Sequence, residues 1–186
     1  MRGVAVVGGM SAYRFDRIKV LIVDDNLHMR KMLAAIVQAF GVTSIFEAPN
    51  GVQAWDKLRS QNPDIIFLDW MMPGMTGLEF TRMVRTSQEC PNPYVSIIMV
   101  TGYTQVEHVH QARDAGVTEF LAKPISANTV LARMTAVIEN PRAFVRTPDY
   151  FGPCRRRRQD KDYTGPERRG AGASKGQTGA IAQAES

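Results

Sequence analysis

The chain has little cysteine and no long hydrophobic run. Its 186 residues include two cysteines, Cys90 and Cys154, which lie far apart and have no partners at metal-ligand spacing. The sequence therefore indicates neither a disulfide framework nor a zinc site. No apolar stretch approaches the roughly 18 to 20 residues of a membrane-spanning helix, and the N-terminus lacks the apolar core and cleavage site of a secretory signal. We expect a soluble protein of the reducing cytoplasm.

Basic residues outnumber acidic ones at the two ends of the chain, and these ends account for its net charge of +5. Residues 1–15 have two basic and no acidic side chains, residues 16–140 have 11 and 13, and residues 141–186 have 10 and five. We predict an N-terminal extension (1–15), a mildly acidic folded domain (16–140) and a basic tail (141–186). Attraction to polyanions is expected of the tail and not of the domain.

Short apolar runs alternate with amphipathic stretches through the predicted domain. The runs are nearly continuous in Val, Ile and Leu, so both faces of each strand are expected to be covered, as in a parallel sheet flanked by helices. We predict an α/β fold in which five (βα) units form an open, doubly wound parallel sheet. The expected strands are 19–23, 44–48, 64–68, 94–100 and 119–122, and the expected helices are 27–40, 51–60, 77–86, 104–115 and 127–139.

Reactive or ligating side chains stand at four of the five expected strand ends. They are Asp24 and Asp25, Asp69, Thr101, and Lys123. Taken singly, each has an ordinary explanation, because Asp25 or Asn26 and Thr101 could cap the following helices and Lys123 could be a solvated turn residue. Ligands of doubly wound sheets bind at the carboxyl ends of the strands, so the four ends together predict a site.

The chemistry of these side chains points to phosphoryl transfer. Three carboxylates at one edge would repel each other, so a cation is expected among them, and ligands that are all oxygen favour Mg²⁺. Thr101 and Lys123 suit the oxygens of a phosphoryl group. Asp69 stands alone at the end of the central run, and Pro73, Gly74 and Gly77 after it could turn the backbone and leave the site open. Asp69 is therefore the best candidate nucleophile for an aspartyl phosphate.

Four segments resemble the receiver domain of two-component response regulators. They are Val-Asp-Asp-Asn at 23–26, Leu-Asp-Trp-Met-Met-Pro-Gly-Met-Thr-Gly at 68–77, Val-Thr-Gly at 100–102 and Ala-Lys-Pro at 122–124. The resemblance covers residues from about 18 to 140 and implies a flavodoxin-like fold with strand order 2-1-3-4-5. Residues 141–186 are too few and too polar for a typical DNA-binding output domain, so the chain resembles the stand-alone, chemotaxis-regulator-like receivers.

The resemblance implies roles for the matching residues. Asp69 would be the phosphoacceptor, Thr101 and Lys123 would contact the phosphoryl oxygens, and Thr101 with Phe120 would form the conformational switch. The implied Mg²⁺ ligands are Asp24, Asp25, Asp69 and the main-chain carbonyl of Met71. The protein would not be an enzyme beyond catalysing its own phosphorylation and dephosphorylation.

Partners are implied in the same way. The phosphodonor would be a sensor histidine kinase or a histidine phosphotransfer protein. The face formed by the fourth helix, fifth strand and fifth helix would bind a downstream protein or a second copy of the chain. The sequence separates neither a phosphate shuttle from a direct effector nor a start at Met1 from one at Met10.

The basic tail contains an internal repeat, Tyr-Xaa-Gly-Pro-Xaa-Arg-Arg, at an offset of 13 residues. Aromatic and guanidinium groups suit anionic or aromatic surfaces. The tail is therefore interpreted as an arm for a protein or nucleic acid, as a solvated and largely disordered extension, or as a segment that docks on the acidic domain and is released on phosphorylation. The candidate binding residues are Tyr150, Arg155, Arg156, Arg157, Arg158, Tyr163, Arg168 and Arg169.

Two other functions are compatible with parts of the sequence. A nucleic-acid-binding regulator would act through the arginine-rich tail. An aspartyl-phosphate hydrolase of the dehalogenase-like class also uses a strand-end aspartate and Mg²⁺. That class resembles Asp-x-Asp at its nucleophile, whereas Met71 stands at the second position after Asp69, so the hydrolase is the less favoured alternative.

Overall fold

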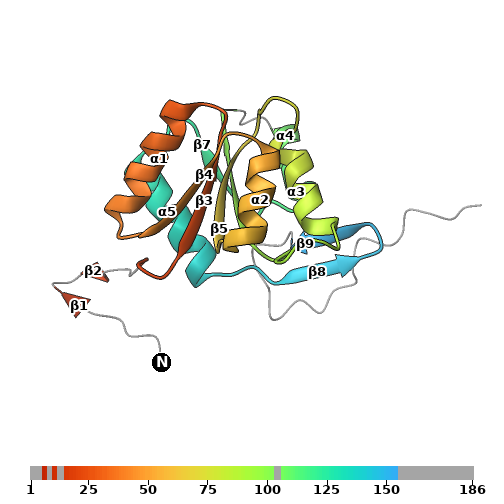
Figure 1. Cartoon of the computed structure of the whole chain (residues 1–186). Helices are drawn as coiled ribbons and strands as arrows, with labels where there is room; N and C mark the ends of the chain where they lie inside the picture. Colours follow the sequence, from red (N-terminus) through yellow and green to blue (C-terminus); the bar gives the residue numbers. More distant parts are fainter. Residues whose placement is uncertain (1–5, 8–9, 12–14, 103–105, 155–186) are drawn as a thin grey trace, which may run out of the picture.

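A five-stranded parallel sheet is the centre of the molecule (Figure 1). The structure is a computed structural model that describes residues 6–7, 10–11, 15–102 and 106–154. The strand order is β4-β3-β5-β6-β7, which confirms the predicted order 2-1-3-4-5. The strands are β3 (Lys19–Val23), β4 (Ser44–Ala48), β5 (Ile65–Asp69), β6 (Ser96–Thr101) and β7 (Glu119–Ala122).

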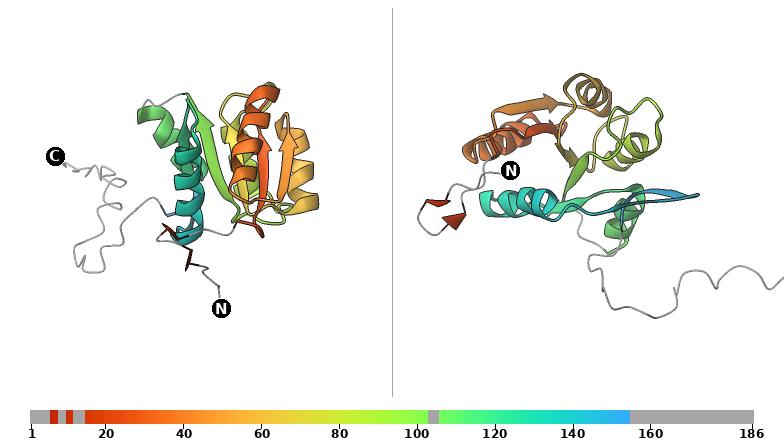
Figure 2. Two further views of the ribbon diagram at one scale, coloured as in Figure 1. Left: turned by 90° about the vertical axis from the view of Figure 1, so that its left-hand side faces the viewer. Right: turned by 90° about the horizontal axis from the view of Figure 1, so that it is seen from below.

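Helices cover both faces of this sheet (Figure 2). Buried side chains of α1 and α5 share one apolar cluster, and those of α2, α3 and α4 belong to the cluster on the other face. Successive strand residues alternate between the two clusters, because side chains point to opposite faces of a strand. The helices are α1 (Leu27–Ala39), α2 (Gly51–Gln61), α3 (Gly77–Thr86), α4 (Val106–Ala115) and α5 (Ala127–Glu139).

Local sequence signals explain where several helices begin and end. Asn26 caps α1 by accepting hydrogen bonds from the amides of His28 and Met29. Thr76 and Glu79 form a reciprocal capping box at the start of α3. Gly116 follows α4 with a φ of 99°, a left-handed conformation that favours glycine. Among the described residues, no helix is long and apolar enough to cross a membrane.

The last residue of the predicted N-terminal extension, Phe15, is part of the apolar core. Phe15 is buried, and its ring lies 6.5 Å from that of Phe40 at the end of α1. Phe15, which the predicted boundary assigns to the extension, packs within the cluster beneath α1 and α5, and the boundary itself stays a prediction. Two short strands, β1 (Val6–Val7) and β2 (Met10–Ser11), pair with each other and not with the main sheet.

The first part of the predicted disordered tail is a β-hairpin. Strand β8 (Phe144–Thr147) pairs antiparallel with β9 (Tyr150–Pro153). Arg142 fixes its base by donating hydrogen bonds to the carbonyls of Thr118 and Cys154. The prediction of a largely disordered tail does not hold for residues 144–153, because tertiary contacts that composition does not reveal order this segment.

A buried arginine joins the hairpin to the domain. The guanidinium of Arg85 on α3 donates hydrogen bonds to the carbonyls of Gly116, Pro93 and Val95 at 3.1, 2.6 and 2.9 Å. The Phe144 ring of β8 covers the group, with its centroid 5.1 Å from the guanidinium carbon. Burial lowers the pKa of Arg85 to about 10, so the side chain stays charged at neutral pH. Arg85 therefore links the two segments that precede β6 and β7 to the hairpin.

Replacing this arginine tests its structural role. We expect Arg85→Ala to lower the free energy of unfolding by about 3 kcal/mol, because three carbonyls, those of Gly116 and Val95 buried, lose their donors. Arg82→Ala is the matched control, because Arg82 is exposed on the same helix, and it should change stability by less than about 0.5 kcal/mol. Urea unfolding followed by circular dichroism measures both. Equal effects of the two substitutions would contradict this role.

Candidate functional site

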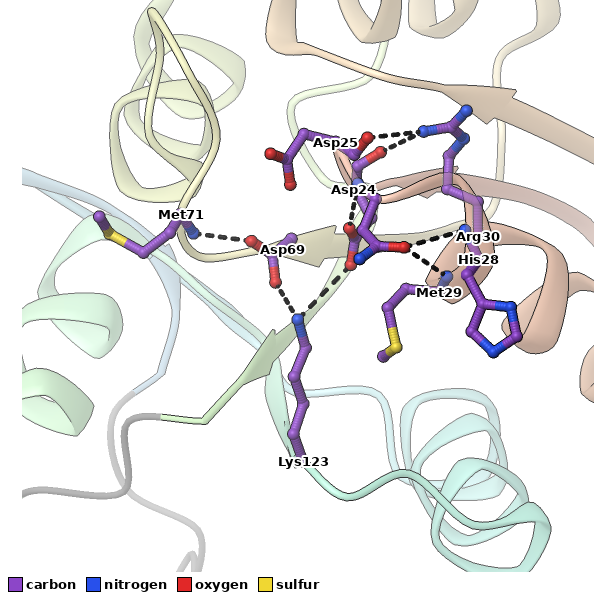
Figure 3. A network of polar contacts seen from close by, with 9 residues as sticks. Asp24, Asp25, His28, Met29, Arg30, Asp69, Met71 and Lys123 are labelled. Atoms are coloured by element: carbon purple, nitrogen blue, oxygen red, sulfur yellow. Dashed lines mark hydrogen bonds and ion pairs between the residues drawn. The ribbon is translucent and has the colours of Figure 1, made fainter.

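The carboxyl edge of the sheet brings together side chains from neighbouring strands. Asp69 is the last residue of β5, and Asp24 directly follows β3, which pairs with β5 in register. Thr101 ends β6, and Lys123 directly follows β7. Because the strands are parallel, all four residues lie at one edge, and Figure 3 shows Asp24, Asp69 and Lys123 converging there.

Lys123 bridges two buried carboxylates. Its ammonium lies 2.6 Å from Oδ1 of Asp69 and 3.6 Å from Oδ2 of Asp24 (Figure 3). Both aspartates are about 6% exposed, so water screens the pairs only in part. One ammonium faces two carboxylates, so the three side chains together carry a net negative charge when all of them are ionised.

Burial and neighbouring charges shift the pKa values of Asp24 and Lys123. Burial raises the pKa of Asp24, the amide of Asn26 offsets part of the rise, and the negative charge of Asp69 raises the pKa further. For Lys123, burial acts to lower the pKa, but the hydrogen bond and charge of Asp69, together with Asp24, outweigh it and raise the pKa. The folded state thus stabilises the charged form of Lys123 and destabilises the charged form of Asp24.

The turn after β3 is fixed by hydrogen bonds around Asp24. Its Oδ1 accepts from the amide of Asn26 at 2.8 Å, which orients the carboxylate toward the site. Arg30 on α1 donates to the carbonyl oxygens of Asp24 and Asp25 at 2.7 and 3.3 Å. Asp25 is exposed, and in Figure 3 it joins the network only through this carbonyl. The structure therefore pairs Asp24, and not Asp25, with Asp69 and Lys123.

The loop after β5 holds Asp69 in place. The amide of Met71 donates to Oδ2 of Asp69 at 2.8 Å, while the Met71 side chain is 54% exposed. Gly77 donates from its amide to the carbonyl of Trp70, and a Cβ at Gly77 would collide with the carbonyl oxygen of Asp69. Glycine is thus required for the close approach of α3 to the end of β5.

Thr101 and Phe120 connect the site to the second half of the sheet. Thr101 is 4% exposed, and its carbonyl accepts the amide of Lys123 at 2.9 Å. Phe120 on β7 is half-buried and packs against the cluster beneath α2, α3 and α4. Residues 103–105, which join Thr101 to α4, lie outside the described residues. The switch role of Thr101 and Phe120 stays a prediction.

The donor atoms fit a hard divalent cation. The carboxylates of Asp24 and Asp69 both contact the Lys123 ammonium and offer only oxygen atoms as donors. Their combined negative charge exceeds the positive charge of Lys123, and Mg²⁺ prefers such an environment. In the part of the chain that the structure describes, no group of three or more His, Cys, Asp or Glu side chains is arranged to hold a metal ion. The full ligand set, with Asp25 and the Met71 carbonyl, therefore stays a prediction.

Comparison with known proteins identifies the family. The model of the response regulator receiver domain matches residues 20–135, well over half of the chain. The chain belongs to the receiver-domain family of response regulators. The family acts in two-component signalling, and its members are signalling proteins that are phosphorylated on an aspartate.

Individual relatives agree with this assignment. The receiver is 33% identical over 122 residues to the chemotaxis protein CheY of Pseudomonas aeruginosa, covering 66% of this chain and 97% of that protein. It is 33% identical to the phosphate regulon transcriptional regulatory protein PhoB of the same organism, covering 64% of this chain but 51% of PhoB. The crystallised chemotaxis protein CheY4 of Vibrio cholerae shares its fold, with a TM-score of 0.61, 32% identity and coverage of 65% and 98%.

Two residues shape the receiver's site in ways that the sequence motifs do not reveal. Arg30 lies four residues after the α1 cap, a helical spacing that returns its side chain toward the preceding turn. Gly77 was interpreted as a turn residue, whereas its importance is close packing against Asp69. The tail candidates Arg155, Arg156, Arg157, Arg158, Tyr163, Arg168 and Arg169 lie outside the described residues, and Tyr150 lies in β9, away from this site.

Neutralising Asp24 tests the charge balance. The folded state raises the pKa of Asp24, so ionisation destabilises the fold at neutral pH. We expect Asp24→Asn to raise the free energy of unfolding by up to about 1 kcal/mol at pH 7 in a chelator, and the gain to vanish well below pH 3.8, the ordinary pKa of Asp. The exposed Asp25 supplies the control, Asp25→Asn. A loss of stability for Asp24→Asn at pH 7 would contradict this account.

Proposed function

We propose that this receiver is a phosphorylation-dependent signalling module whose phosphoacceptor is Asp69. The observation that carries the proposal is the hydrogen bond and ion pair between Lys123 and Asp69, at the end of the central strand. It places a carboxylate nucleophile beside a cation that can follow the incoming phosphoryl oxygens. Membership of the receiver family supports the same role.

The proposed reaction is transfer from a phosphohistidine. An oxygen of the Asp69 carboxylate attacks the phosphorus, the bond between phosphorus and the imidazole nitrogen breaks, and that nitrogen keeps the electron pair and takes up a proton. The product is an aspartyl phosphate. Lys123 would move its hydrogen bond from the carboxylate to a phosphoryl oxygen, and Thr101 would donate its hydroxyl to another.

Asp24, Asp25, Asp69 and the Met71 carbonyl are the residues that would hold Mg²⁺. When bound, the ion neutralises negative charge on the phosphoryl oxygens during transfer. Asp24 is pre-positioned for this by the Asn26 amide, and burial together with the charge of Asp69 raises its pKa, a cost of ionisation that a cation would offset. Self-phosphorylation and self-dephosphorylation are the only catalytic steps that we assign to the chain.

The partners follow from the same proposal. A sensor histidine kinase or histidine phosphotransfer protein would supply the phosphoryl group, in the cytoplasm. The surface of α4, β7 and α5 would bind a downstream protein or a second copy, because Thr101 and Phe120 connect the acceptor to this side of the sheet. Phosphorylation would bias an existing equilibrium by its added contacts, by about 1 to 3 kcal/mol.

The two alternatives have less support. The position two residues after Asp69 is the exposed Met71, so this site lacks the second carboxylate that an Asp-x-Asp hydrolase would use. Nucleic-acid binding through residues 155–158 stays a prediction, because these residues lie outside the described part of the chain. Its signature would be steeply salt-dependent binding that is lost when the four arginines become alanine.

Intact mass spectrometry tests the proposed acceptor. After incubation with Mg²⁺ and acetyl phosphate, we expect the wild-type mass to increase by one phosphoryl group. Asp69→Asn should show no increase, because the amide is a poor nucleophile, whereas Asp64→Asn, a change at the opposite edge of the sheet, should behave as the wild type. An unmodified wild-type protein, or a modified Asp69→Asn variant, would contradict the proposal.

Thermal unfolding tests the proposed metal ligands separately. A ligand that binds only the folded state raises the melting temperature, so Mg²⁺ should raise that of the wild type. Asp24→Asn should reduce this shift, although it stabilises the metal-free protein. The exposed Asp114 on α4 supplies the control, Asp114→Asn, which should retain the full shift. Equal Mg²⁺-induced shifts in all three proteins would refute the assignment of Asp24.

A further inference from the structure

The proposed phosphorylation chemistry does not use the Tyr-Xaa-Gly-Pro repeat. Its first copy is strand β9 (Tyr150–Pro153), and its second copy, residues 163–166, lies outside the described residues. The first copy therefore shows what the motif does when it is docked on the receiver.

The tyrosine of the first copy anchors β9 to α4. The hydroxyl of Tyr150 lies 2.8 Å from the carbonyl oxygen of Pro153 and 3.4 Å from that of Arg113, in the last turn of α4. The ring thus spans the motif and reaches the receiver surface. A phenylalanine at this position would keep the ring but lose the hydrogen-bonding group.

The glycine and proline of the motif make the close contacts. A Cβ on Gly152 would lie 3.0 Å from the Cα of Gly116 and 2.6 Å from the hydroxyl oxygen of Tyr150. Gly152 and Pro153 are both buried, and Pro153 pairs with Phe144 on β8. We name the surface formed by Arg113, Gly116 and β8 the α4-turn site. The tyrosine and the glycine of Tyr-Xaa-Gly-Pro each meet a requirement of this site, and the proline is buried beside them.

The second copy keeps these three residues as Tyr163, Gly165 and Pro166. It has Thr164 where the first copy has Phe151, whose ring contacts Tyr94 and Phe144. Cys154, the residue after Pro153, makes its contacts through its backbone. Its amide donates to the Ala143 carbonyl, and its carbonyl accepts from Arg142. The second copy therefore lacks the contacts of the Phe151 ring with Tyr94, Phe144 and Arg146, but it keeps the tyrosine, glycine and proline.

We propose that the α4-turn site binds either copy of the motif, so that residues 163–166 exchange with residues 150–153 within one chain. The exchange is intramolecular because a short tether gives the second copy a high effective concentration at the site. It replaces a tight hairpin turn by a longer loop, which carries a modest entropic cost. Exchange transfers the arginines at 155–158 from the segment after the docked strand to the loop before it.

Single and double substitutions in the full chain test this exchange. We expect Tyr150→Ala and Tyr163→Ala each to lower the melting temperature by less than about 2 °C, because the intact copy occupies the site. The double variant should lose about 4 to 8 °C, far more than the sum of the two. The chemical shift of the Gly116 amide, measured by NMR, should stay near its wild-type value in each single variant and move in the double variant.

A matched pair separates docking from loss of an aromatic ring. Gly152→Val and Gly165→Val block the close approach to Gly116 and should show the same non-additivity. If Tyr150→Ala alone causes the whole loss, or if the double variant loses nothing, the proposal is wrong. The melting temperature of Tyr150→Ala should also be independent of protein concentration, whereas a fall on dilution would show docking between chains and overturn exchange within one chain.

Discussion

The ammonium of Lys123 between two buried carboxylates is the interaction on which the site depends. Parallel pairing of β3, β5, β6 and β7 places Asp24, Asp69 and Lys123 at one edge, because each residue stands at or directly after the end of its strand. A shift of one residue in any strand would turn these side chains to the other face. The apolar strands beneath the site therefore fix its geometry. The two carboxylates carry more negative charge than Lys123 neutralises, so a cation would be favourable there.

The five-stranded sheet could be predicted because several signals agree. Apolar runs of strand length alternate with helical periodicity, and the caps at Asn26 and Thr76 match local sequence preferences. The motifs at strand ends also located Asp69 and Lys123. The different placements of Asp24 and Asp25 could not be predicted, because adjacent residues in a turn diverge in ways that depend on the Asn26 and Arg30 contacts.

The hairpin was missed because its stability is tertiary. Residues 144–153 have only two charged side chains, but the segment is short and rich in turn formers, so its composition alone does not predict a folded strand pair. What orders them is a buried guanidinium on α3 and the close approach of Gly152 to Gly116. These contacts lie before β6 and β7, at the amino edge of the sheet, whereas Asp69 lies at the carboxyl edge. The proposed acceptor and the hairpin thus lie at opposite ends of one fold.

Locating the phosphoryl group is the most direct test of the central claim. Borohydride reduction of the protein after acetyl phosphate treatment converts an aspartyl phosphate to homoserine, which peptide mass mapping places in the sequence. The account predicts homoserine at position 69 alone, and only when Mg²⁺ is present during the treatment. Homoserine at position 24 or 25, or a phosphoryl group on a tail residue, would contradict it.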